Sequence, residues 1–90
     1  MEIFKNITDT DAFCDMPLSA QTLYFHLATR ADEQGRVSQK DLDKVPWVLL
    51  HRQGNSIYEM ELLKEKGYIT VIGSKVRVVQ TEGQRLALKP

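Results

Sequence analysis

Two runs of alternating residues joined by a glycine-first pair constrain this chain more than any other feature. The runs are Ile69–Ile72 and Lys75–Val79, and the pair between them is Gly73-Ser74. Such a pair is typical of a tight type II′ turn, which joins antiparallel strands. The residues predicted to face each other are Ile69 with Val78, Thr70 with Arg77, Val71 with Val76, and Ile72 with Lys75. The hairpin would therefore have one apolar face, which must cover a core, and one partly cationic face.

A stripe of apolar residues at helical spacing precedes this hairpin in the sequence. Its members are Ala20, Leu23, Tyr24, Leu27, Ala28 and Ala31. This spacing predicts a helix with one buried face. Ser19 is the predicted N-cap, and Pro17 keeps the preceding chain extended. The helix is predicted to end in the polar turn 32–35, where Gly35 can adopt a positive φ. We expect His26, beside the stripe, to be a packed and hydrogen-bonded side chain rather than a ligand.

Shorter elements should follow this helix. Arg36-Val37 is long enough for one or two sheet pairings, and Ser38 is a predicted N-cap for a second helix. Pro46 has no amide to continue that helix, so the helix is either short or bent. Alternatively, Pro46 begins a further turn over 47–50. The sequence leaves both options open.

A third helix is predicted from about Ile57 to Lys66. Ser56 and Glu59 have the spacing of a capping box, in which each side chain satisfies a backbone amide at the start of a helix. Gly67 supplies the exit. A final polar segment, residues 81–90, is predicted to be a tail or a short helix.

The order helix, short strand, helix, helix and hairpin predicts an α+β fold, a small winged helix-turn-helix. Three helices would enclose a small core, and a two- or three-stranded β wing would cover its open side. The 90 residues fit one domain, with 1–12 as an N-terminal arm.

The N-terminal half also carries a recognisable string of residues. Its parts are Asp11-Ala12-Phe13, Asp15-Met16-Pro17-Leu18-Ser19, Leu23-Tyr24-Phe25-His26-Leu27, Ala31-Asp32, Gly35 and Val37. The string resembles the winged-helix N-terminal domain of phage and prophage replication-initiation proteins of the primosomal DnaD type. The C-terminal half, in 62–69 and 79–83, resembles winged-helix transcription regulators in general. These resemblances imply DNA binding in replication initiation or in transcription regulation.

Charge is unevenly distributed along the neutral chain. Residues 1–50 have a net charge of −3 and residues 51–90 a net charge of +3, so we expect any nucleic-acid contact in the C-terminal half. In a winged helix the third helix enters the major groove and the wing lies on the neighbouring backbone or minor groove. The wing candidates are Ser74, Lys75 and Arg77. The candidates for the groove are Arg52, Gln53, Asn55, Ser56 and Lys64.

The acids of the third helix argue for weak binding. Glu59, Glu61 and Glu65 would repel phosphate, and one chain could neutralise about three to five phosphates. We therefore expect a homodimer, with Ile3-Phe4, Trp47 or the C-terminal tail at the contact, and replication proteins are possible further partners. The alternative is a winged-helix module for protein interaction or oligomerisation without direct DNA contact. That alternative explains the neutral charge and the acidic helix equally well.

The sequence does not predict an enzyme, a cofactor or a metal site. It has no phosphate-cradling glycine loop, nucleophile elbow or zinc-ligand spacing. Cys14 is the only cysteine, so an intrachain disulfide is excluded, and we expect a buried structural thiol. No signal peptide or membrane-spanning apolar stretch is present, which predicts a cytoplasmic protein with no membrane contact.

Overall fold

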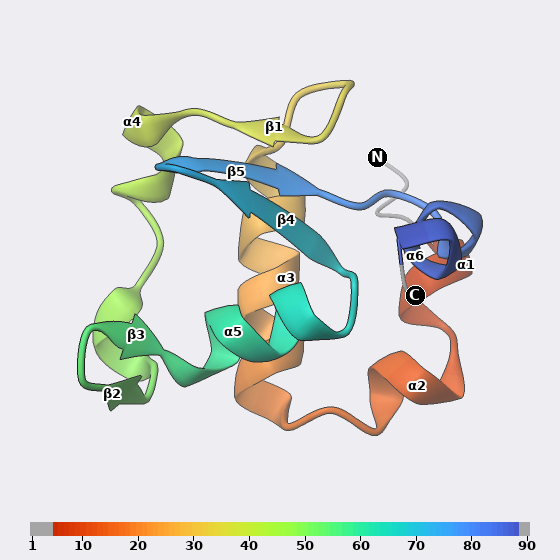
Figure 1. Cartoon of the computed structure of the whole chain (residues 1–90), viewed down its shortest axis with the longest axis horizontal. Helices are drawn as coiled ribbons and strands as arrows, with labels where there is room; N and C mark the ends of the chain where they lie inside the picture. The colour runs from red at the N-terminus through yellow and green to blue at the C-terminus, as the bar shows by residue number, and fades with distance from the viewer. Residues whose placement is uncertain (1–4, 89–90) are drawn as a thin grey trace.

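A central helix, α3 (Leu18–Arg30), runs from one end of the domain to the other in the computed structural model, which describes residues 5–88 (Figure 1). Before it come α1 (Lys5–Thr8) and α2 (Asp11–Cys14). The elements after it are β1 (Arg36–Val37), α4 (Gln39–Leu42), the 3-10 turn η1 (Trp47–Leu49), β2 (Arg52–Gln53), β3 (Ser56–Ile57), α5 (Tyr58–Glu65), β4 (Ile69–Ile72), β5 (Lys75–Val78) and α6 (Glu82–Leu88). The chain is thus a small α+β domain with antiparallel sheets. None of the helices within residues 5–88 has the length and apolar character needed to cross a membrane.

The predicted hairpin is confirmed with its register. All four expected pairs between β4 and β5 are present, and Gly73 adopts a φ of 62° at the turn. β1 adds a third strand in the order β1-β5-β4, with Arg36 opposite Arg77. The apolar face is buried through residues such as Ile69 and Val78.

The central helix is also confirmed, but its start is not the one predicted. Its apolar stripe is buried from Ala20 to Ala28. The helix begins at Leu18, and the carbonyl of Pro17 accepts hydrogen bonds from the amides of Ala20 and Gln21. The prediction that Ser19 is the N-cap is therefore wrong, because Ser19 lies inside the first turn, where its hydroxyl donates to Glu59.

The turn after α3 brings two backbone segments into close contact. Gly35 has a φ of 83°, and its carbonyl accepts a hydrogen bond from the amide of Val78 at 2.6 Å. A Cβ atom on residue 35 would lie 2.3 Å from the carbonyl oxygen of Val78. Only glycine fits this position, both for its backbone angle and for the space available.

An aromatic cluster forms the centre of the core. The rings of Phe13, Tyr24 and Tyr68 meet edge to face, with centroids 5.3 to 5.8 Å apart. Ile7, within the predicted N-terminal arm, is fully buried in this core. Cys14 is exposed, so the expectation of a buried thiol is wrong. The predicted dimer contact at residues 3 and 4 lies outside the described residues.

Pro46 separates two short helical turns. Ser38 caps α4 as predicted, because its hydroxyl accepts the amide of Asp41 at 3.1 Å. α4 ends at Leu42, and η1 starts directly after Pro46, so the second of the two options for this proline is confirmed. Trp47 is half-buried, and its indole donates to the carbonyl of Leu42 at 2.9 Å.

The third predicted helix, α5, is present without the predicted capping box. Ser56 belongs to β3, where it pairs with Gln53, and Ile57 takes the N-cap position without a side-chain hydrogen bond. The carboxylate of Glu59 accepts from His51 instead. The polar C-terminal segment is helical, as α6, and buries Arg85.

Candidate nucleic-acid interface

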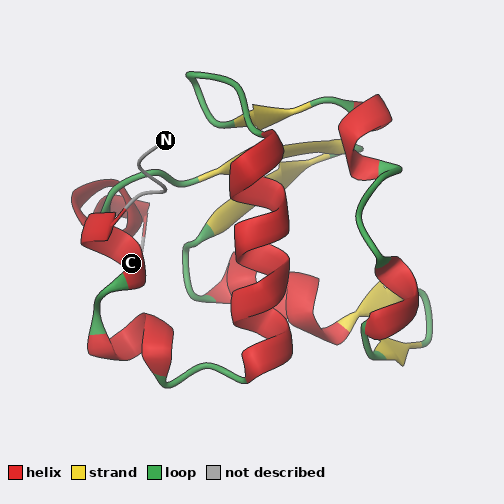
Figure 2. Cartoon of the chain, turned by 180° about the vertical axis from the view of Figure 1, so that it is seen from behind, coloured by secondary structure: helices red, strands yellow, loops and turns green. Residues whose placement is uncertain are grey.

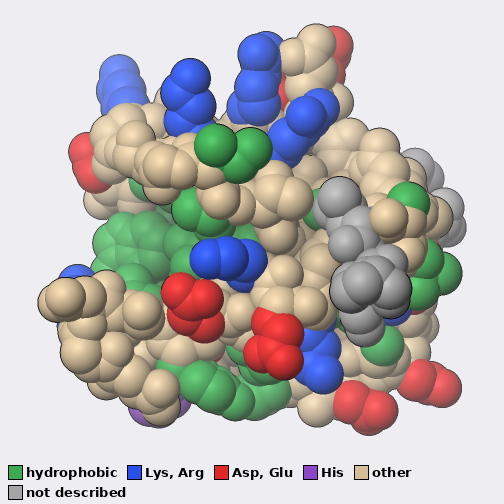
Figure 3. Space-filling model, in the orientation of Figure 1, with side chains coloured by type: hydrophobic (Ala, Val, Ile, Leu, Met, Phe, Trp, Pro, Cys, Tyr) green, Lys and Arg blue, Asp and Glu red, His purple; other side chains and the backbone are tan. Residues whose placement is uncertain are grey.

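Three exposed cations lie on the outer face of the three-stranded sheet. Arg36 on β1 is opposite Arg77 on β5, and Lys75 lies two residues along the same strand. Side chains two residues apart in a strand point to the same face, so all three project from one surface, the cationic face. Figure 3 shows Lys and Arg side chains gathered over the sheet end of the molecule.

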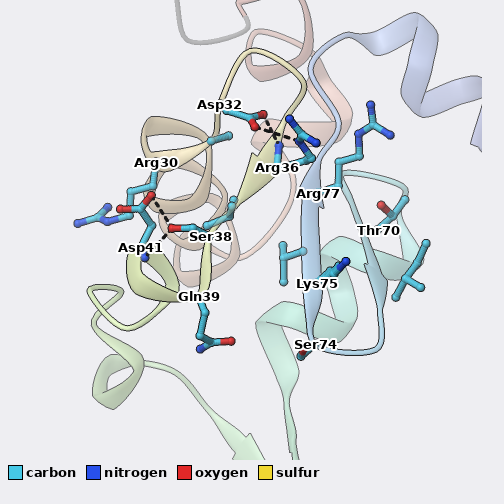
Figure 4. Close-up of a pocket in the computed structure, with 14 residues that line it drawn as sticks. Arg30, Asp32, Arg36, Ser38, Gln39, Asp41, Thr70, Ser74, Lys75 and Arg77 are labelled. Carbon is cyan, nitrogen blue, oxygen red and sulfur yellow. Dashed lines mark hydrogen bonds and ion pairs between the residues drawn. The ribbon is translucent and has the colours of Figure 1, made fainter.

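The two arginines of the cationic face are held in place by the turn before β1. The Arg36 Nε donates to an oxygen of Asp32 at 3.0 Å (Figure 4). The Arg77 Nε donates to the carbonyl of Gln34 at 2.8 Å. The amide of Arg36 donates to Asp32, as does that of Gln34, and with the Arg36 guanidinium they lower the pKa of the Asp32 carboxyl. Each guanidinium is thus anchored through its Nε atom.

The cationic face borders a broad hollow of about 720 Å³. Arg30 at the end of α3 also lines this hollow, so four cations are present together with two carboxylates, Asp32 and Asp41. Asp32 is paired with Arg36, and Asp41 accepts from the hydroxyl of Ser38 at 3.0 Å. The charged groups that line the hollow therefore have a net charge of +2, which favours an anionic ligand.

The structure brings the predicted wing residues together. Ser74, Lys75 and Arg77 all line this hollow. Sequence reasoning missed Arg30 and Arg36 as members of the same site. Part of the signal for Arg36 was available, because a short strand was predicted at Arg36-Val37. The sequence did not show which of the two open edges of the hairpin this strand joins, and it is the pairing with β5 that places Arg36 beside Arg77.

The residues predicted for the groove lie elsewhere. Arg52, Gln53, Asn55 and Ser56 are exposed on a separate hairpin, β2–β3, whose loop contains Gly54 with a φ of 63°. This hairpin and the β1-β5-β4 sheet lie at opposite ends of the molecule in Figure 1. Four of the five predicted groove residues therefore lie on this hairpin, which directly precedes α5 in the chain.

The exposed side of α5 carries charges of both signs, because Glu59, one of the three acids expected to repel phosphate, is fully buried. Lys64, the fifth predicted groove residue, forms an exposed ion pair with Glu61 at 3.7 Å, and Glu65 is exposed nearby. Figure 3 shows acidic side chains in the middle of the view, below the cationic face. The exposed Lys66 follows the helix directly, so two acids and two bases lie on this surface. A surface without net positive charge does not attract a phosphate backbone, so α5 is less suited than the sheet to approach DNA.

A buried carboxylate fixes the base of the β2–β3 hairpin. Glu59 is fully buried and accepts from the backbone amide of His51 at 2.9 Å, from the His51 ring Nδ1 and from the hydroxyl of Ser19. Burial alone would raise the pKa of Glu59, but the hydrogen bonds from the His51 ring, Ser19 and the His51 amide overcome this effect and lower the pKa to about 2. Glu59 therefore links α5, α3 and the start of the hairpin as a charged group.

Within 5–88, no group of three or more His, Cys, Asp or Glu side chains is arranged to hold a metal ion. Comparisons with protein-family models, with curated proteins and with solved structures found no match.

Proposed function

We propose that this chain is a winged-helix domain that binds double-stranded DNA through the cationic face of its wing. In this assignment α3, α4 and α5 are the three helices, and the β4–β5 hairpin, extended by β1, is the wing. The order of elements and the burial of the apolar hairpin face against the helices support it. The resemblance of the N-terminal half to phage replication-initiation proteins favours a role in replication initiation, and that of the C-terminal half favours transcription regulation.

The arrangement of Arg36, Lys75 and Arg77 is the observation that carries the proposal. Residues two apart in a strand are separated by roughly 6.8 Å, and neighbouring strands by about 4.8 Å. The three cations therefore cover a short, flat path on one face. A path of this kind can follow a phosphate backbone, and backbone contacts position a protein without reading sequence.

The number of cations sets the expected strength of binding. Three or four phosphate contacts give a slope of log affinity against log salt of about −3 to −4 for one chain. This small electrostatic contribution, together with the lack of net positive charge on the exposed side of α5, predicts weak binding with little preference for sequence. A dimer would double the slope.

Fluorescence anisotropy with a labelled random duplex, at two or more salt concentrations, tests the proposal. Arg77→Glu and Lys75→Glu should each lower the affinity about tenfold or more at low salt and reduce the salt slope by about 1. Arg52→Glu is the matched control, because it makes the same change in charge on the distant β2–β3 hairpin. The proposal fails if the wild-type chain does not bind duplex DNA at low salt, or if Arg52→Glu weakens binding as much as Arg77→Glu.

A protein-interaction module is the second candidate function. An exposed apolar groove lined by residues of α3 and of the segment around η1 favours it. Absence of DNA binding at low salt, with an intact fold, would favour this second function over the first.

A further inference from the structure

One acid contacts the cationic face directly. Asp32 lies in the turn between α3 and β1, which Figure 2 shows as the loop that leaves the end of the central helix and enters the sheet. Its carboxylate accepts from the amides of Gln34 and Arg36 at 2.9 Å each, and from the Arg36 Nε at 3.0 Å. The chain therefore supplies its own anion to one of the cations proposed to bind DNA.

The two arginines that face each other across the sheet differ in the charge of their partners. Arg77 donates through Nε to the carbonyl of Gln34 at 2.8 Å, and a carbonyl has no net charge. Arg36 donates to a carboxylate. Within residues 5–88, no ion pair joins a carboxylate to Arg77, Lys75 or Arg30. Arg36 thus differs from the other cations of the hollow, because a carboxylate of the same chain compensates its charge.

We infer that Asp32 opposes DNA binding by Arg36, as a contact in the free chain that a phosphate must share or displace. The inference rests on the proposed function, since it concerns the regulation of the same face. Both side chains are open to solvent, with Arg36 67% and Asp32 46% exposed. A phosphate that reaches the Arg36 guanidinium therefore comes close to the Asp32 carboxylate, and the two anions repel each other.

The turn holds the Asp32 carboxylate in this place. The amide of Arg36, together with that of Gln34 and the Arg36 guanidinium, lowers the pKa of the Asp32 carboxyl, so the group is charged at neutral pH. Gly35 in the same turn is fixed against β5, because its carbonyl accepts from the amide of Val78 at 2.6 Å. Rotation of the carboxylate away from an incoming phosphate would break its bonds to two backbone amides, so the repulsion persists in the complex.

Asp32→Asn separates the charge of this side chain from its contribution to the turn. Asparagine keeps one carbonyl oxygen, which can still accept from the amides of Gln34 and Arg36. Its NH₂ group is a donor, so it cannot accept from the Arg36 Nε. The substitution therefore frees the Arg36 guanidinium and leaves the backbone of the turn in place.

Fluorescence anisotropy with the labelled random duplex at low salt tests the inference. Asp32→Asn should raise the affinity about threefold to tenfold and make the salt slope steeper by about 1, because Arg36 becomes available to one further phosphate. Asp41→Asn is the matched control. It makes the same change in charge in the same hollow, but Asp41 accepts from the hydroxyl of Ser38 instead of pairing with a cation. It should raise the affinity by no more than about twofold.

Arg36→Gln gives a second test that does not depend on the folding of Asp32→Asn. In the wild-type background it should lower the affinity only about twofold, whereas Arg77→Gln should lower it about fivefold or more. In the Asp32→Asn background, Arg36→Gln should weaken binding about as much as Arg77→Gln does. Such non-additivity between Asp32 and Arg36 measures their direct coupling.

The proposed function and this inference fail in different ways. Absence of duplex binding by the wild-type chain at low salt overturns both. If the wild-type chain binds, the inference alone is overturned when Asp32→Asn does not raise the affinity, or when Asp41→Asn raises it equally. It is also overturned when Arg36→Gln and Arg77→Gln weaken wild-type binding to the same extent. Circular dichroism melting of each variant checks that the domain is folded.

Discussion

Replacing Glu59 by glutamine tests the role of the buried carboxylate at the base of the β2–β3 hairpin. Glutamine keeps the shape of the side chain and one carbonyl oxygen, which can still accept from the His51 amide. It removes the negative charge that faces the His51 ring. The substitution therefore isolates the contribution of ionised Glu59 while it leaves packing almost unchanged.

The pKa of Glu59 sets the size of the effect. The difference between an ordinary value of 4.5 and about 2 in the folded chain corresponds to about 3 kcal/mol of stability at neutral pH. This figure is an upper bound, because Glu59 lies under a thin cover formed by the His51 side chain, which is 70% exposed. Glutamine also retains part of the hydrogen bonding. We expect Glu59→Gln to lower the free energy of unfolding by about 1–3 kcal/mol at pH 7.

The pH dependence of this stability difference is a sharper test than its value at pH 7 alone. The folded pKa is below the unfolded one, so the stabilisation is fully present above about pH 4.5 and is lost as the pH falls towards 2. The difference between wild type and Glu59→Gln should therefore fall to roughly half at pH 3. Urea unfolding followed by circular dichroism, at several pH values, measures this difference.

Glu61→Gln is the matched control for the buried acid. Glu61 lies on the same helix and forms an exposed ion pair with Lys64, and exposed pairs contribute about 0–1 kcal/mol. Its loss should change stability by less than about 0.5 kcal/mol. The reasoning is refuted if Glu59→Gln matches wild type at pH 7, or if its deficit is the same at pH 7 and pH 3.

Three further substitutions test the core and its connections. Gly35→Ala should destabilise the fold by about 2 kcal/mol or more in urea unfolding, because it adds positive-φ strain and a clash with the carbonyl of Val78. Tyr24→Phe should cost about 1–2 kcal/mol by thermal unfolding, since it removes the 2.7 Å hydrogen bond to the carbonyl of Val79. Arg85→Ala should release α6 and increase amide hydrogen exchange there, because Arg85 pairs with a carboxylate one turn earlier and stacks on a buried tyrosine ring at 4.8 Å.

The spacing of apolar, glycine and capping residues was enough to predict the β4–β5 hairpin, α3 and the cap of α4, because residues close in sequence determine these elements. The β4–β5 register follows from the Gly73-Ser74 turn and the alternation around it, and the α3 stripe follows from helical spacing. The cap at Ser38 depends only on the next three residues. In each case the competing structures would expose apolar side chains or leave amides without acceptors.

Two features that were not predicted are the β2–β3 hairpin and the hydrogen bonds of Glu59. The hairpin has strands of only two residues each, and the partners of Glu59 come from segments distant in sequence. Gly54-Asn55 is also a glycine-first pair that suits a tight hairpin turn, but its flanks lack the alternating apolar residues that made the wing recognisable. Ser56 and Glu59 fit a capping box locally, yet the approach of α3 and the His51 backbone gives the Glu59 carboxylate other donors. The residues for a capping box and for the observed hydrogen bonds of Glu59 are both present in the sequence, and tertiary packing selects the second arrangement.

The hydrogen bond between Tyr24 and Val79 has a consequence for how the chain is made. It joins residues 55 positions apart, and the aromatic cluster beneath it combines rings from α2, from α3 and from the segment after α5. Contacts of such long range form only after the intervening chain has been closed into a loop. A nascent chain on the ribosome therefore cannot complete this cluster and its hydrogen bond to Val79 until translation has passed the second strand of the wing.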